Sequence, residues 1–331
     1  MSAGHNVHFV GSLPAEDTAS ALEALSNSLG GVLKRVPDGE TGARSKFVTW
    51  QAPVFGTSEQ FEVGELGPQS EWGPNGEFPP RVIGLKPGAT GRPTFAPTGY
   101  ADEAIESYRQ FREAKTAGRF VADARLQVGL PTPLGVLTIF MEPDAQAVAE
   151  PAYTDSLSAD LDRICREIPN EELSVQWDVP SEIAIWEGYT DTFLDDDKNA
   201  CVDRLVALMD RVPEGAELGM HLCYGDISHK HWKEPDVELM AAFTNTVLER
   251  LGRRLDYVHL PIPRDWTEPA RYAGLSSFKL PEETEMILGL LHLTDGIDGA
   301  RTRIDAARSH LASFGLATGC GLGRRDPGAW A

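Results

Sequence analysis

The chain has 331 residues, with 50 acidic and 30 basic side chains, which give a formal net charge of −20 at pH 7. A field of this sign repels nucleic acid and anionic membrane surfaces, and no cluster of Lys and Arg offsets it, so we expect neither as a partner. The longest apolar stretches, such as 286–293, are far shorter than the ~20 residues that cross a bilayer.

Eight short segments rich in β-branched and apolar residues alternate with longer amphipathic stretches. These segments are 7–10, 32–36, 125–130, 173–179, 217–224, 256–262, 286–293 and 315–319. Strands joined by helical crossovers pair in parallel, so the pattern predicts an α/β fold, a single (β/α)8 TIM barrel domain over residues 1–331. An open doubly wound sheet is the alternative, but the chain lacks the glycine-rich phosphate loop that usually accompanies it.

Residues 50–100, between the second and third predicted strands, form a long insertion rich in Gly and Pro. Only a small hairpin around 81–86 is suggested there. Because a connection from strand to helix overhangs the C-terminal mouth of a barrel, we expect this insertion to cover the mouth as a lid. A contact between copies of the chain is the other interpretation.

Polar side chains gather directly after the predicted strands, where a barrel brings them together. They are Ser12, Glu40, Thr132, Asp178, His221, Cys223, His259 and Cys320. His221 and Cys223 lie two residues apart on one strand and therefore point to the same face. A neutral imidazole and a thiolate on one face are half of a tetrahedral zinc site. A buried Cys beside a hydrogen-bonded His would have the same spacing.

Five elements occur in an order that resembles a known family. VGSLP (10–14), PDGE (37–40), QWDVPSEIA (176–184), HLCY (221–224) and CGLGRR (320–325) resemble the catalytic C-terminal barrel of cobalamin-independent methionine synthase. The resemblance implies that His221, Cys223 and Cys320 are zinc ligands. It also implies that Ser12, Glu40 and Asp178 hold the amino-acid end of a thiol substrate, and that the methyl donor is of the folate type.

Two departures from the family pattern concern the metal and its surroundings. The fourth zinc ligand of that family is a Glu at the end of the sixth strand, where this chain has Leu260 and Pro261. His259 lies nearby and is a candidate for the vacant position. The element after the fourth strand reads Asp178-Val179-Pro180, with Val where the family has Glu.

Other candidates have two readings each. Arg44 could clamp a substrate carboxylate through a bidentate contact or pair with a surface acid. Asp295 could face the methyl donor or form a turn. His229 and His231 could gate the site or lie in a surface turn, and His8 is expected in the core.

These observations predict a zinc-dependent methyl or alkyl transferase that acts on a small thiol, with Asp178, His221 and His259 as catalytic groups. The alternative is a related barrel lyase or decarboxylase that uses Asp178, Glu40 and His221 as acid and base groups without zinc. A non-catalytic binding protein on the same scaffold is a third reading. Four cysteines without a secretory signal favour reduced thiols and a cytoplasmic location.

Overall fold

The computed structural model describes residues 6–65, 81–226 and 230–326. Its central sheet has eight strands, all paired in parallel, in the order β1-β10-β9-β8-β7-β6-β5-β2. The strands are β1 (Val7–His8), β2 (Arg35–Pro37), β5 (Arg125–Pro131), β6 (Leu173–Asp178), β7 (Glu217–His221), β8 (Tyr257–Pro261), β9 (Glu285–Leu291) and β10 (Gly315–Thr318).

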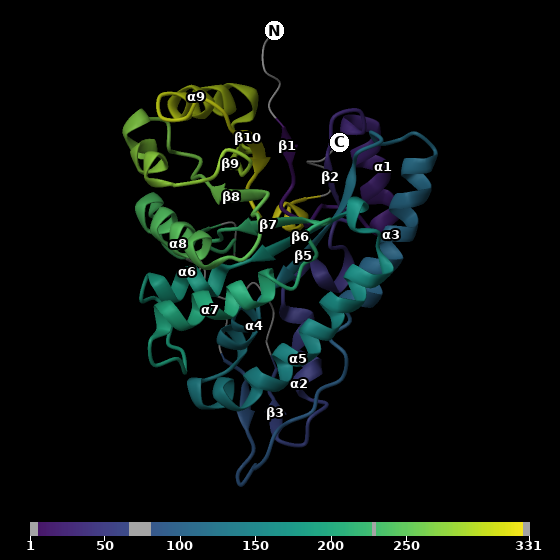
Figure 1. Ribbon diagram of the computed structural model, residues 1–331, viewed down its shortest axis with the longest axis vertical. Helices are drawn as coiled ribbons and strands as arrows, with labels where there is room; N and C mark the ends of the chain where they lie inside the picture. The colour runs from purple at the N-terminus through teal and green to yellow at the C-terminus, as the bar shows by residue number, and fades with distance from the viewer. Residues whose placement is uncertain (1–5, 66–80, 227–229, 327–331) are drawn as a thin grey trace.

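The two outer strands meet and nearly close the sheet. Just beyond β1 and β2, Ser12 forms a parallel bridge with Gly39, and the Leu13 amide donates to the Gly39 carbonyl at 2.8 Å. Figure 1 shows β1 between β10 and β2, with helices around the outside. The predicted (β/α)8 barrel is confirmed, and each of the eight predicted segments overlaps an observed strand.

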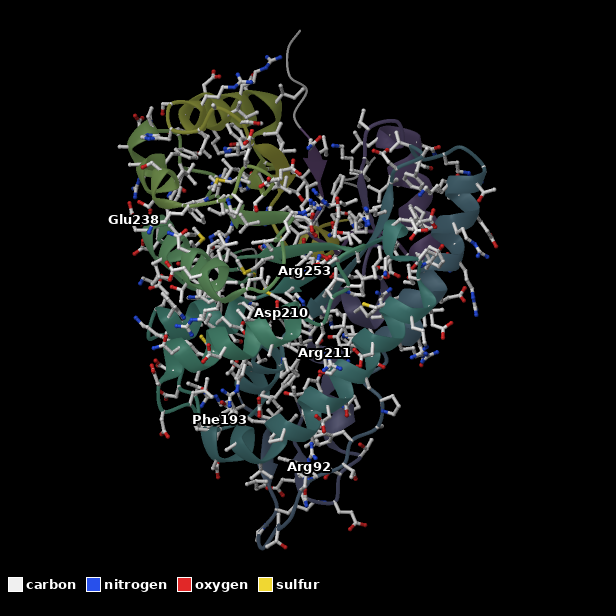
Figure 2. All side chains as sticks on the ribbon, viewed as in Figure 1. Arg92, Phe193, Asp210, Arg211, Glu238 and Arg253 are labelled. Atoms are coloured by element: carbon white, nitrogen blue, oxygen red, sulfur yellow. The ribbon has the colours of Figure 1, made fainter. Side chains whose placement is uncertain are left out.

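Helices connect the strands and cover the barrel. They are α1 (Thr18–Leu29), α3 (Tyr100–Thr116), α4 (Pro133–Phe140), α5 (Pro143–Glu167), α6 (Pro180–Trp186), α7 (Asp197–Met209), α8 (Val237–Arg250) and α9 (Gly296–Arg308). A 3-10 segment, η5 (Pro269–Ser277), follows β8. Charged side chains lie on the outer surface, among them Arg211 after α7 and Glu238 on α8 (Figure 2). The helices therefore present an apolar face inward and the chain's charge outward.

Strand β6 shows how residue alternation builds both the core and the site. Leu173, Val175 and Trp177 are fully buried in the main hydrophobic cluster. Their neighbours along the strand include Gln176 and Asp178, which point to the opposite face because side chains alternate across a strand. Gln176 contacts groups of β1 and β8 and so lies inside the barrel.

The described parts of the insertion form a short helix and a two-stranded sheet outside the barrel. Helix α2 (Ala52–Phe55) leads to β3 (Phe61–Val63), which pairs antiparallel with β4 (Ile83–Leu85). Where a small hairpin was expected, 81–86 holds one strand, and its partner lies at 61–63. The described parts pack along α5: the Gln51 and Tyr153 side chains are hydrogen-bonded at 2.8 Å, and Phe55 stacks on Tyr153. In Figure 1 the β3 region lies at the end of the molecule opposite α9.

A buried charge network occupies the end of the barrel where the strands begin. Arg35, 7% exposed, pairs with Glu217 at 2.7 Å and Glu285 at 2.9 Å, and its guanidinium lies 4.1 Å from the centre of the Tyr257 ring. Gly219 makes room for this ring, since a Cβ there would fall 2.0 Å from it. This end is closed by paired charges and aromatic packing.

Among the described helices, none combines the length and the apolar character required to cross a membrane.

Candidate active site

One pocket lies at the end of the barrel where the strands terminate. It is partly open to solvent. Its walls include six residues that the sequence singled out: Ser12, Glu40, Asp178, His221, Cys223 and Cys320. The wall also includes residues 46–49, and Arg324. Residues from distant parts of the chain thus share one solvent-accessible site.

The two cysteines face each other across the pocket wall. Their sulfur atoms are 3.8 Å apart, and the Gly225 amide donates to the Cys223 sulfur at 3.3 Å. The hydrogen bond from the Cys320 thiol holds the pKa of Cys223 well below its usual value, while the same contact raises the pKa of Cys320. The arrangement favours one thiolate even before a metal ion adds its charge.

His221 completes a group of three donors. Its ring nitrogen and the two sulfur atoms all lie within 4.8 Å of one another. Nδ1 of His221 contacts Nδ1 of His259 at 2.7 Å, so Nε2 is the nitrogen left for another partner. This buried Nε2 has no hydrogen-bond partner in the described structure. An imidazole nitrogen left open beside two thiols suits a soft divalent metal ion, so His221, Cys223 and Cys320 could bind one.

Glu40 reaches the pocket through an unusual backbone. Gly39 has φ +88°, and Glu40 itself has φ +44°, a left-handed conformation that costs free energy in a non-glycine residue. Its carboxylate lies over two glycines: a Cβ at Gly11 or Gly129 would come within 2.2 or 2.8 Å of Oε1. The turn and both glycines therefore aim this carboxylate inward.

Enclosure changes the acidity of both pocket acids. Burial, followed by the charges of Asp178 and Asp38, raises the pKa of Glu40 to about 8. Burial also raises the pKa of Asp178 to about 7, with the negative Cys223 adding to the effect. Gln176 donates to Asp178 at 2.9 Å and partly opposes this shift. Two carboxyl groups that titrate near neutral pH are poised to take up a cation or move a proton.

Ser12 links the pocket to the last turn of the chain. The Gly323 amide donates to the Ser12 hydroxyl at 3.3 Å. A Cβ at Gly323 would come within 2.8 Å of the Ser12 Cβ, so this close approach requires glycine. Ser12 thereby positions the segment that carries Cys320.

Three predicted residues lie elsewhere than their proposed roles suggest. Arg44 does not line the described pocket wall; its guanidinium contacts Asp38 at 2.8 Å and Glu103 at 3.2 Å. His259 is fully buried behind His221 and does not belong to the group of three donors. Asp295 forms a salt bridge with the buried Arg303 at 2.6 Å, so its role is structural.

The remaining candidates are easily placed. Thr132 caps α4 by accepting from the Gly135 amide at 2.8 Å. His8 is buried and contacts Gln176, as expected of a core residue. His231 lines a neighbouring hollow that also includes Cys320, and His229 falls outside the described residues.

The described parts of the insertion, 50–65 and 81–100, contribute nothing to the pocket wall. The segment that reaches the pocket is 46–49, immediately before the insertion. Residues 66–80 lie outside the described residues, so the lid over the mouth stays a prediction.

Sequence reasoning did not assign a role to three charged residues of the pocket wall: Lys46, Asp226 and Arg324. Arg324 contacts Asp226 at 3.1 Å and the Ser45 carbonyl at 3.4 Å, and its Nε is buried without a partner among the described residues. A Cβ at Gly321, whose φ is +72°, would collide with Asp226. The signal for Arg324 was its place in the CGLGRR element, four residues after Cys320.

Fold and site together define a (β/α)8 barrel with a possible metal-binding group and two carboxyl groups at its C-terminal mouth. No protein-family model matches the chain, and no curated protein matches its sequence. Among solved structures, the chain is similar to one from Listeria monocytogenes described as a "Putative Vitamin-B12 Independent Methionine Synthase". The TM-score is 0.52 at 14% identity, over 95% of this chain and 81% of that one. At this identity the likeness establishes a shared fold.

Proposed function

We propose that this protein is an enzyme that transfers a methyl or alkyl group to a small thiol, with zinc held by His221, Cys223 and Cys320. The observation that carries the proposal is the group of three donors within 4.8 Å, next to two carboxyl groups in the same pocket. Zinc at this group would act as a Lewis acid that keeps a substrate thiol deprotonated near neutral pH. Two thiolates and a neutral imidazole balance its charge.

The pocket residues bind the rest of an amino-acid thiol. Glu40 and Asp178 accept hydrogen bonds from its ammonium group, and the positive charge favours their ionised forms. Ser12 contributes a hydroxyl group at the same wall. We assign the substrate carboxylate to Arg324 instead of Arg44, because Arg324 lines the pocket wall and Arg44 does not.

Binding both reactants in one pocket contributes to catalysis by orienting them. A folate-type compound is the methyl donor that the sequence resemblance implies, and it enters the proposal as the first donor to test. Free cysteines agree with the cytoplasmic location that we propose.

The test begins with the parent protein reconstituted with zinc under reducing conditions. We expect about one equivalent of zinc by mass spectrometry and a marked loss in Cys320→Ser. The thiol panel contains homocysteine and 4-mercaptobutyrate, which differ only in the amino group. Faster methylation of homocysteine, with the difference abolished in Glu40→Gln, supports the proposal. A parent that holds far less than one equivalent, or a serine variant that holds as much as the parent, overturns the zinc site.

A second function follows from the acidity of the pocket. Carboxyl groups with pKa values of about 8 at Glu40 and about 7 at Asp178 suit general acid and base catalysis, as in a lyase or decarboxylase. This reaction would not require zinc. Activity that survives treatment with a chelator but is lost in Asp178→Asn would favour it over thiol transfer.

A further inference from the structure

A second hollow opens at the barrel mouth, next to the candidate active site. Its wall contains residues from the ends of three neighbouring strands: 263–265 after β8, 291–294 at the end of β9 and 318–320 at the end of β10. It shares Asp226 and Cys320 with the pocket that contains the three metal donors. A molecule in this hollow would lie beside the proposed metal site and leave the first pocket open for the thiol.

The charge of this wall is opposite to that of the whole chain. Its cationic side chains outnumber its acidic ones: they are Lys230, Arg264 and Arg325, against Asp226 and Asp265. Asp226 already forms a salt bridge with Arg324 of the neighbouring pocket at 3.1 Å. In a protein with a formal net charge of −20, this local excess of positive charge favours an anionic ligand.

Two arginines of the wall have no carboxylate partner among the described residues. Most arginines of the chain form a salt bridge, as Arg324 does with Asp226. Arg264 contacts the Thr294 hydroxyl at 3.2 Å, and neither its guanidinium nor that of Arg325 pairs with a described acid. Their N–H groups can therefore bind an oxyanion, which a guanidinium grips through two parallel hydrogen bonds.

Buried hydrogen bonds fix the segments that carry this wall. The fully buried Arg303 of α9 donates to the Arg264 carbonyl at 2.7 Å and to the Leu290 carbonyl at 2.9 Å. Nε2 of His292 donates to the Ile262 carbonyl at 2.9 Å. These bonds join the end of β8 to the end of β9. The wall is therefore formed before a ligand arrives, which lowers the entropic cost of binding.

Apolar side chains form much of the remaining wall. They are Pro263, Leu291, Leu293 and Leu322. Leu293 is 51% exposed, so apolar surface is open to solvent beside the cations. A ligand with an apolar body and an anionic end would cover this surface and pair with the arginines.

We propose that this hollow is a second substrate site, which binds a small molecule with an apolar body and a carboxylate or phosphate group held by Arg264 and Arg325. The role of the occupant rests on the proposed function: it is the donor of the methyl or alkyl group. Cys320, which lines both spaces, then lies where the two reactants meet. Binding of the anion itself requires neither zinc nor thiol.

The first experiment measures binding to the metal-free chain by calorimetry at low ionic strength. The probes are N-benzoylglutamate and phenyl phosphate, which carry the two kinds of oxyanion on an aromatic body, and benzamide is the neutral control. We expect one anion to bind at least about 10-fold more tightly than benzamide, and added salt to weaken it. The tighter probe identifies the oxyanion as carboxylate or phosphate.

Substitutions then locate the bound anion. Arg264→Gln and Arg325→Gln should each weaken the tighter probe by about 10-fold, because a charge-assisted hydrogen bond is lost. Both side chains reach solvent, so we expect both variants to fold. The matched control is Arg112→Gln on α3, an exposed arginine that also has no salt bridge among the described residues. This control should bind the probe like the parent.

Three results would overturn the site. The first is a parent that binds neither anion more tightly than benzamide. The second is an equal loss in Arg112→Gln and in the two variants of the wall. The third is a loss in Arg324→Gln with none in Arg264→Gln, since the anion would then occupy the neighbouring pocket.

Kinetics separates this inference from the proposed function. In an active enzyme, Arg325→Gln should raise the KM of an anionic donor by about 10-fold and leave the KM of the thiol unchanged. Arg324→Gln should instead raise the KM of the thiol. An unchanged donor KM in Arg325→Gln would overturn the donor site while the transferase stands. If no thiol is alkylated, the proposed function fails, and calorimetry alone decides whether the anion site exists.

Discussion

Both ends of the barrel bury charged groups, but Arg35 forms salt bridges at one end, whereas the two pocket acids lack them at the other. At the end where the strands begin, Arg35 has two carboxylate partners, and Glu285 also accepts from Asn6 at 2.7 Å. At the mouth, burial raises the pKa of both Glu40 and Asp178, and neither forms a salt bridge among the described residues. The His221 Nε2 likewise has no hydrogen-bond partner among them. Paired buried charges hold the barrel closed, whereas unpaired ones leave binding capacity for a ligand.

The largest expected effect comes from breaking the paired end. Arg35→Ala leaves the partly buried Glu217 and Glu285 without this cation and removes a buried side chain, so we expect a loss of about 3 kcal/mol in the free energy of unfolding. Urea denaturation at pH 7 measures it. Zinc affinity should change little, since Arg35 lies at the opposite end of the strands. A loss below about 1 kcal/mol would contradict the role given to this network.

The reverse pattern is expected at the mouth. Cys223→Ser should weaken zinc binding by about 100-fold or more, because a hydroxyl group is a poor substitute for a thiolate ligand. The metal-free variant should unfold within about 1 kcal/mol of the parent. Chelator competition and urea denaturation of the same samples give both values. A variant that keeps its affinity but loses stability would make Cys223 a core residue.

The pocket acids should make the metal-free protein less stable as the pH rises. The folded-state pKa of Glu40, about 8, lies above its unfolded value of about 4.5. Its contribution is therefore fully present below pH 4.5 and is lost as the pH rises through 8. Glu40→Gln should gain on the order of 1–3 kcal/mol relative to the parent at pH 9 and little at pH 5.

The control for this pH dependence is a variant that also lacks the second pocket acid, Asp178. Asp178, with a pKa of about 7, should account for part of the slope that remains in Glu40→Gln. Glu40→Gln/Asp178→Asn should remove that part as well. A parent whose stability is independent of pH between 5 and 9 would contradict the enclosure of both groups.

The smallest effect is expected for a charge pair on the surface. Arg211 and Asp162 are 2.6 Å apart, but their side chains are 43% and 50% exposed. Arg211→Ala should change the free energy of unfolding by less than about 1 kcal/mol, and added salt should reduce the difference. A larger loss, measured by the same urea denaturation, would show that burial alone does not decide how much a charge pair contributes to stability.

The sequence by itself determined the architecture, because parallel strands have a local signature. Segments such as 173–178 and 257–261 are short, apolar and separated by amphipathic helices, and this periodicity requires no knowledge of distant contacts. The same local reasoning placed His221 and Cys223 on one face, since alternation along a strand acts over two residues. Ser12, Glu40, Asp178 and Cys320 followed from the rule that strand ends converge in a barrel.

Only the tertiary structure decided which side chains have partners. Arg44 follows the PDGE element and Arg324 lies within CGLGRR, but Asp38 and Glu103 hold Arg44, while Arg324 lines the pocket wall. Likewise, nothing near His259 in the sequence indicates that its ring contacts the ring of His221. Such contacts join residues far apart along the chain. They depend on strand register and on the space left by residues such as Gly289, which exist only once the barrel has closed.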